Sequence, residues 1–329
     1  MHRPTRRFIL SASAMAVLGV ASSAHAQAFP EASRPIHLIV PYAPGGSSDF
    51  LARIVAKKMS ENMNHNVVVE NKPGASTIIG ADYVAKSKPD GYTLYLIGEL
   101  THSALGPLNA KLPFDPVKDF AAVTNLIESP LVISVPQEFP ASNLKEFVSY
   151  AKARPGAVNY GSAGLGNTLH LAGEQFSKVA GVQMNHVQYK GASQAIIDLL
   201  AGRIQVMFDL PQTPLPHIQS GKLKALAVTS RKRLPMLPQV PTTAEAGFPQ
   251  YLFSTRVGVS APAGTPEPIL KKLHAELVKV TQDPEVSRAL EEKAMLVATS
   301  ASPQEYQQRF DATVSVVKDL LSGVKAEGK

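Results

Sequence analysis

The most constraining feature of the sequence is a loop rich in proline, glycine and serine between a strand pattern and a helix pattern. The apolar run at residues 36–40 predicts a strand, and the amphipathic pattern at residues 50–63 predicts a helix. A helix that begins directly after such a loop has backbone N–H groups without intrahelical acceptors, and its dipole favours an anion there. The loop, residues 41–49, therefore predicts an anion site, although many loops of this composition only make a turn.

A second loop of the same design strengthens the anion-site interpretation. Residues 160–168 follow a short strand pattern at 157–160 and open into a helix pattern at 169–179. In the first loop, Gly45 and Gly46 leave room for close approach, and Ser47 or Ser48 can cap the helix or offer a hydroxyl to a ligand. Two such loops predict one pocket with a wall from each of two lobes.

The alternation of strand and helix patterns predicts an α/β fold with largely parallel sheets. Strands are expected at residues 36–40, 66–70, 92–97, 122–127, 131–135, 157–160, 183–188, 205–208, 223–228 and 253–260. Helices are expected at residues 50–63, 77–85, 144–153, 169–179 and 193–201, near Pro216, and from Pro266, Pro284 and Pro303.

The chain length predicts two lobes, since a chain of roughly 300 residues usually divides its core. We place residues 27–129 and 254–329 in lobe 1 and residues 130–253 in lobe 2, with chain crossings near 130 and 254. Two lobes joined by two connecting segments can open and close around a ligand.

The first 26 residues have the pattern of a cleaved export signal. Arg3, Arg6 and Arg7 precede an apolar stretch at residues 8–20 and an Ala24-His25-Ala26 cleavage site. The paired arginines also resemble a twin-arginine signal, so Sec export and twin-arginine export both stay open. The sequence contains no cysteine, hence no lipid attachment site, and we expect a soluble, unanchored periplasmic protein.

Composition argues against several functional classes. Without the three signal arginines the chain has 30 basic and 26 acidic residues, a balance of +4 that is too small and dispersed for nucleic acid. There is no Gly-x-Ser-x-Gly elbow, Leu169 stands where a dinucleotide fingerprint needs its last glycine, and no histidines have metal-ligand spacing. We therefore expect no enzyme, no cofactor and no metal.

A series of short segments carries a resemblance to a known family. They are residues 40–49 with Ala52 and Arg53, residues 71–75, 160–164, 189–191, 224–229, 240–247 and 261–266. In this order and spacing the chain resembles the solute-binding proteins of tripartite tricarboxylate transporters, also called Bug proteins. The resemblance implies a two-lobed, type II-like Venus-flytrap protein that passes a carboxylate to a membrane transporter.

The resemblance also implies which residues hold the ligand. In that family the carboxylate is held mainly by backbone amides and ordered water from the two glycine loops. Carried over to this chain, the ligand-binding residues are Tyr42, Ala43, Pro44, Gly45, Gly46, Ser47, Ser48 and Asp49, with Ser162, Ala163, Gly164, Gly166, Asn167 and Thr168.

Two positions depart from the family pattern. Arg256, two residues before Gly258, stands where the family usually has an aromatic residue, and Ala294 replaces a glycine before the last helix. Arg256 could grip a second carboxylate bidentately, or it could be a strand arginine paired with an acid. The first alternative would favour a dicarboxylate, linear or aromatic.

Five candidates are weighed individually. Thr101, His102 and Asp209 follow strand patterns, where ligands of α/β proteins gather, although His102 also suits a structural hydrogen bond. Tyr42 could line the cleft or pack against the first helix. Asp49 would repel an anion, so a structural or lobe-bridging role fits it better than ligation.

Three functional hypotheses follow. The first is a monomeric binding protein that captures a small di- or tricarboxylate for the membrane components of a tripartite tricarboxylate-type transporter. The second is a periplasmic sensor subunit that signals carboxylate occupancy to a membrane partner through the same cleft. The third is a hydrolase acting through Ser47 or Ser162, and no motif in the sequence points to it.

Overall fold

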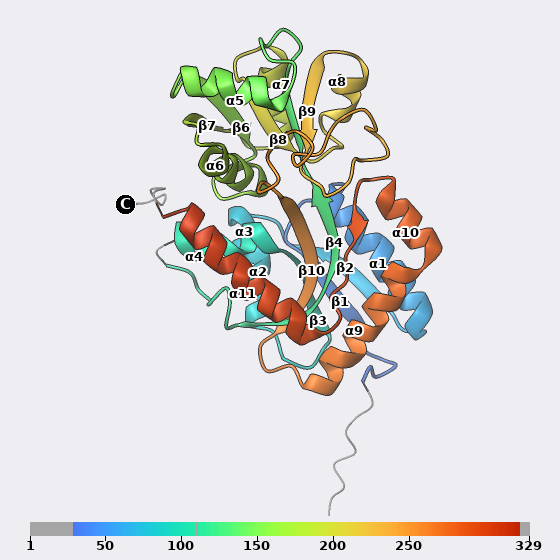
Figure 1. Ribbon diagram of the computed structural model, residues 1–329. Coiled ribbons are helices and arrows are strands. Elements are labelled where there is room, and N and C mark those ends of the chain that lie inside the picture. The colour runs from blue at the N-terminus through green and yellow to red at the C-terminus, as the bar shows by residue number, and fades with distance from the viewer. Residues whose placement is uncertain (1–28, 110, 323–329) are drawn as a thin grey trace, which may run out of the picture.

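The computed structural model describes residues 29–109 and 111–322, so the predicted export segment lies outside the described residues. Two mixed sheets, each flanked by helices, form two halves that lie one above the other (Figure 1). This agrees with the predicted α/β class. Among the helices of the described residues, none combines the length and apolar character that a membrane crossing requires.

The first sheet has six strands in the order β11-β4-β10-β3-β1-β2. Strands β1 and β2, and β1 and β3, are parallel, whereas β10 runs antiparallel to both β3 and β4, and β11 antiparallel to β4. The bounds are Ile36–Val40 (β1), Val67–Asn71 (β2), Thr93–Gly98 (β3), Phe120–Pro130 (β4), Ser254–Pro262 (β10) and Leu296–Val297 (β11).

Helices cover both faces of this sheet because its strands alternate between two apolar clusters. Leu38 and Val40 pack toward α1 and α9, whereas Ile39 packs toward α2 and α11. One face carries α1 (Ser47–Met63), α9 (Glu267–Gln282) and α10 (Pro284–Glu291); the other carries α2 (Ile78–Ala85), α3 (Glu99–Ser103), α4 (Leu105–Leu108) and α11 (Pro303–Leu320).

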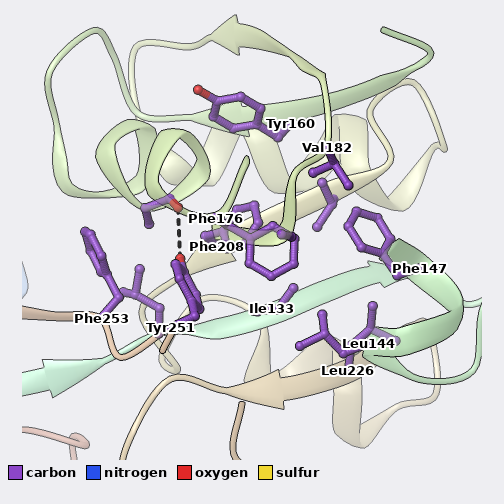
Figure 2. Packing of buried hydrophobic residues seen from close by; sticks show 14 of the residues in the cluster. Ile133, Leu144, Phe147, Tyr160, Phe176, Val182, Phe208, Leu226, Tyr251 and Phe253 are labelled. Carbon is purple, nitrogen blue, oxygen red and sulfur yellow. Dashed lines mark hydrogen bonds between the residues drawn. The ribbon is translucent and has the colours of Figure 1, made fainter. Parts of the chain in front are cut away.

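The second sheet has five strands in the order β7-β6-β8-β5-β9. Its strands are Val132–Pro136 (β5), Val158–Ser162 (β6), Met184–Gln188 (β7), Val206–Asp209 (β8) and Leu223–Val228 (β9), and its helices are Leu144–Ala153 (α5), Thr168–Ala180 (α6), Ala192–Leu200 (α7) and Leu215–Gln219 (α8). Figure 2 shows aromatic rings such as Phe147, Phe176 and Phe208 filling its core. The buried Tyr251 hydroxyl donates a 2.8 Å hydrogen bond to the Ala172 carbonyl of α6, so this ring buries no unpaired polar group.

Two short connections join the halves, and one threonine ties them together. Leu131 separates β4 from β5, and Phe253 precedes β10. The Thr229 hydroxyl accepts a 2.8 Å hydrogen bond from the Leu131 N–H and donates to the Phe253 carbonyl at 2.5 Å. Both crossing segments are thus held to one side chain at the predicted hinge. The lobe boundaries themselves stay a prediction.

The C-terminal helix contacts both halves. Tyr306 and Phe310 pack into an apolar cluster of the first sheet, whereas Val317 joins the core cluster that also contains residues of the second. In Figure 1 this helix, α11, lies along the side of the molecule and ends beside α6.

Some expectations about elements were wrong. The sheets are mixed rather than largely parallel, because β5 and β10 each run antiparallel to their neighbours after the chain changes sheets. Residues 128–130, expected as a break, belong to β4, whose polar Glu128 and Ser129 hid the strand pattern. The short helices α3 and α4 and the two-residue strand β11 were not predicted.

Gly258 provides a test of this packing. A Cβ at Gly258 on β10 would lie 2.1 Å from the Tyr306 hydroxyl and 2.6 Å from the Thr124 carbonyl. We expect Gly258→Ala to lower the free energy of unfolding by about 2–3 kcal/mol, measured by urea denaturation. Gly106→Ala is the control, since a Cβ there meets Pro116 at an ordinary 3.7 Å. Equal stability of the two variants would contradict the predicted clash.

Candidate ligand-binding site

Both glycine loops line one cavity of about 840 Å³ that is built from residues of both sheets. The first loop contributes Tyr42, Ala43, Ser47 and Ser48, and the second contributes Ala163, Gly164, Gly166, Asn167 and Thr168. Loops that end parallel strands at neighbouring sheet edges commonly form such ligand sites. The structure therefore brings together most of the two segments predicted from sequence.

The first loop presents backbone donors because no side chain caps the helix behind it. Helix α1 begins at Ser47 after Gly46, and the Gly46 position makes no side-chain cap. The first intrahelical hydrogen bond of α1 is donated by the Phe50 N–H to the Gly46 carbonyl. The N–H groups of the turn before it have no intrahelical acceptor, and the helix dipole adds a partial positive charge.

Asp49 holds this loop rather than the ligand. Its side chain is buried and accepts hydrogen bonds from Arg53, from the Gly45 N–H at 3.0 Å and from the Asn71 amide at 3.0 Å. The Arg53 hydrogen bond, with those of Gly45 and Asn71, lowers the pKa of Asp49 to about 2. Asp49 is not among the cavity-lining residues and does not bridge the lobes, so its predicted ligand role is not supported by its position.

The second loop owes its shape to glycines and a capping asparagine. The Asn167 side chain accepts a hydrogen bond from the His170 N–H at the start of α6. Gly166 has a φ of +73°, and a Cβ there would lie 2.1 Å from Leu108 of α4. Only glycine allows this close approach between the loop and the opposite half of the molecule.

Two histidines, the buried His170 and the half-buried His186, lie beneath the second loop. His170 Nδ1 accepts the Gly166 N–H at 3.1 Å, and His186 Nε2 lies 2.6 Å from the Ser162 hydroxyl. Their ring centroids are 4.1 Å apart, and burial lowers the pKa of each to about 4. Both rings are therefore neutral near pH 7, which leaves His170 Nδ1 free to accept.

Ser162 is fully buried, and its hydroxyl lies between His186 and the Gly164 backbone. The structure therefore places it under the loop rather than in the cavity, which removes the basis for a Ser162 nucleophile. Pro44, Gly45 and Gly46 form the exposed outer turn of the first loop and do not line the cavity either.

Two candidates at strand ends also lie outside the cavity. His102 is buried among aromatic rings and bonds the Pro116 carbonyl at 2.8 Å, and burial lowers its pKa to about 4. Asp209 is buried, accepts the Leu210 N–H at 2.7 Å, and has its pKa raised by burial to about 7. Thr101 and Tyr42 do line the cavity, and Tyr42 also packs against the cluster under α1.

Arg256 faces away from the cavity. Its neighbours on β10, Thr255 and Val257, line the cavity, and side chains alternate along a strand. The Arg256 guanidinium lies 3.8 Å from Glu99 and 3.7 Å from Glu128. Of the two alternatives for Arg256, the structure supports a strand arginine paired with acids. It does not support the binding of a second carboxylate by this side chain.

Several residues that line the cavity were not predicted from the sequence. The segment 73–78, Leu105 and Leu108 of α4, and Lys190 with Gly191 before α7 all line the cavity. Residues 73–75 and 190–191 lie in segments that carry the family resemblance. That resemblance was the only sequence feature that marked them. Within the described residues the cavity wall contains no aspartate or glutamate, and Lys190 is its single charged residue.

Comparison with known proteins decides the family. Residues 51–324 match the model of the tripartite tricarboxylate transporter family receptor. The chain belongs to this family. The resemblance noted from the sequence is thereby confirmed; the family consists of periplasmic solute-binding receptors and not of enzymes.

Three relatives illustrate the similarity. The chain is 35% identical to protein BugT of Bordetella pertussis, over 87% of this chain and 85% of BugT. It is 33% identical to the solved structure of Rhodopseudomonas palustris Rpa4515 with adipate (TM-score 0.77; 89% of this chain, 97% of that one). It is 31% identical to the solved structure of MatC of the same organism with bound malate (TM-score 0.74; 89% of this chain, 100% of that one). These matches confirm the predicted fold of two-lobed periplasmic binding proteins.

The Asp49 network generates a pH prediction. Because the folded pKa lies below the usual value, Asp49 contributes stability that is present above about pH 4 and lost as pH falls toward 2. We expect the stability difference between wild type and Asp49→Asn to be largest at pH 7 and to shrink over that window. Urea denaturation at several pH values measures it, with Arg53→Gln as the matched partner variant. A difference that does not change with pH would contradict this assignment.

The histidine pair generates a second pH prediction. It rests on a base that stays neutral in the folded protein, whereas the first rests on an acid that stays ionised. An unfolded histidine binds its proton near pH 6.5, whereas folded His170 binds it near 4, so stability should fall as pH drops from 6.5 to 4. His170→Asn keeps an acceptor near the Nδ1 position and should reduce this slope while retaining stability at pH 7. His170→Gln should reduce the slope equally but lower stability, because its acceptor is displaced. An unchanged slope in both variants would refute the role.

Proposed function

We propose that the chain captures a small di- or tricarboxylate between its two lobes and delivers it to the membrane components of a tripartite tricarboxylate-type transporter. The observation that carries the proposal is the composition of the cavity wall. Backbone donors at the starts of α1 and α6 line a cavity without any carboxylate among its described residues. Such a wall favours an anion over a neutral or cationic ligand.

The energetics are sufficient for tight binding. A micromolar dissociation constant corresponds to about 8 kcal/mol. Hydrogen bonds to a charged group contribute about 1.5–3 kcal/mol each, so roughly four or five donors can supply this amount even after the lobes close. Ser47 and Ser48 on one side and the second loop on the other line the same cavity, and we expect their donors to share one carboxylate.

The relatives support the ligand class. Two solved structures that share about a third of their residues with this chain contain adipate and malate, and both compounds are small dicarboxylates. The family description supports a transporter as the partner. We further propose that the mature chain is exported without a lipid anchor and acts as a monomer.

The proposal is tested by placing one negative charge in the cavity wall. Ala43 belongs to the first loop, is exposed and lines the cavity. We expect Ala43→Asp to weaken binding of adipate or malate at least tenfold, about 1.4 kcal/mol, because two like charges would share one site. Isothermal titration calorimetry measures this, and Ala43→Asn, of nearly the same shape, should stay within about threefold of wild type.

The same titrations decide the broader proposal. A wild-type protein that binds none of a panel of mono-, di- and tricarboxylates would overturn it. Equal losses in Ala43→Asp and Ala43→Asn would show that the ligand is recognised by shape and not by its charge.

A further inference from the structure

A hydrogen bond between the two halves lies at the end of α10. The Gln212 side chain is in the turn between β8 and α8 of the second half, and Lys293 lies between α10 and β11 of the first. Gln212 Nε2 donates to the Lys293 carbonyl. Neither residue belongs to the two segments that connect the halves, so this bond is a separate contact between them.

The Lys293 carbonyl is available because of the way in which α10 ends. Ala294 has a φ of +52°, and its N–H donates to the Glu291 carbonyl at 2.8 Å. The Met295 N–H donates to the Leu290 carbonyl at 3.0 Å, and these two side chains pack in one cluster. Such a pair of bonds closes a helix around a left-handed residue. It does not use the Lys293 carbonyl, which a fixed turn therefore presents to another acceptor's partner, a side-chain donor.

A short, stiff turn positions the donor. Pro211 and Pro214 are buried on either side of Gln212, and proline fixes its own φ. At the start of the turn, the Asp209 side chain accepts the Leu210 N–H at 2.7 Å. The backbone at Gln212 is thus already ordered, and only its side-chain torsions lose freedom when the bond forms.

The contact borders the cavity. Leu210, two residues before Gln212, and Met295, two residues after Lys293, both line the cavity. Leu210 packs against a core cluster of the second half, and Met295 is buried in one of the first. In Figure 1, α10 and α4 lie on opposite sides of the molecule, and α4 makes the close approach to Gly166. The halves therefore meet on both sides, and a rotation that opens the cavity at α10 separates Gln212 from its acceptor.

We infer that Gln212 is a positioning residue for solute binding: its hydrogen bond to the Lys293 carbonyl stabilises the closed arrangement of the halves and slows the release of any bound solute. This inference rests on the proposed function and adds to it a residue that controls retention. Gln212 is not among the residues that line the cavity, so it acts through the opposite half of the protein and not by touching the solute.

Such a bond has a signature that a ligand contact lacks. A bond that exists only when the halves are closed adds its net free energy to the closed state, whatever solute is inside. The net contribution of one neutral hydrogen bond changes an equilibrium about three- to tenfold. A side chain that touched the solute would instead favour some solutes over others.

The test removes the donor and leaves the rest of the chain unchanged. Gln212→Met has nearly the same length and no donor, and Gln212→Asn keeps the amide on a shorter side chain. Gln239→Met, at an exposed position of the same half, is the control. Association and dissociation rate constants are measured by stopped-flow mixing for succinate, adipate, malate and butyrate. The mature chain is used, freed of bound solute by unfolding and refolding, and the Tm without solute is recorded.

The expected result is a uniform change in release. In Gln212→Met and Gln212→Asn, the dissociation rate constant of every acid that wild type binds should rise by the same factor, about three- to tenfold. Association rate constants should stay within about twofold, because the bond forms after the solute has entered. The Tm without solute should stay within about 1 °C of wild type, as expected for a partly exposed position. Gln239→Met should match wild type throughout.

The failures of the two proposals can be distinguished. If wild type binds none of the acids, the proposed function fails and this inference falls with it. If wild type binds them and both Gln212 variants release them at the wild-type rate, only the role of Gln212 is overturned. Factors that differ between solutes would mean that Gln212 contacts the solute. A lower Tm with unchanged rates would make the bond merely structural, and either result contradicts the inference.

Discussion

The structure depends on peptide N–H groups that the helices cannot satisfy themselves. Helices α1 and α6 both begin at the wall of the central cavity, and both follow loops whose glycines keep side chains out of the way. The surrounding residues hold these loops in place: Asp49 with Arg53 and Asn71 beneath one, His170 and His186 beneath the other. Charged side chains hold the first loop from behind, and the two loops present their backbone to the cavity.

This arrangement also explains the two connections between the halves. A ligand held by donors from both halves, as we propose, would favour their approach. Thr229 holds both crossing segments through one hydroxyl, and the close contact of Gly166 with Leu108 limits how near the loop and α4 can come. The long helix α11 packs against both core clusters and so connects the two halves a third time.

Much of the fold could be predicted because helix and strand periods follow from burial, which the sequence records directly. The strand Ile36–Val40 and the helix Leu144–Ala153 were bounded correctly from apolar spacing alone. Strand direction could not be predicted, since β10 has the same alternation whether it runs parallel or antiparallel. In the site, glycine marked both loops and proline the first, but side-chain direction did not follow from position: Arg256 and Thr255 are neighbours that face opposite sides. The positive φ values of Ala75, Ser76 and Thr77 before α2 could not be predicted, because residues of these types do not normally adopt them.

Recognition by the backbone has an evolutionary consequence. Every residue except proline supplies the same N–H, so almost no substitution in the two glycine loops can delete the donors, provided that the loop shape survives. Much of the remaining cavity wall, in contrast, consists of side chains such as those of Leu105 and Leu108, which can change one at a time. If the loops hold the charged end as we propose, a single substitution elsewhere in the cavity wall can change which solute fits while the backbone donors stay in place.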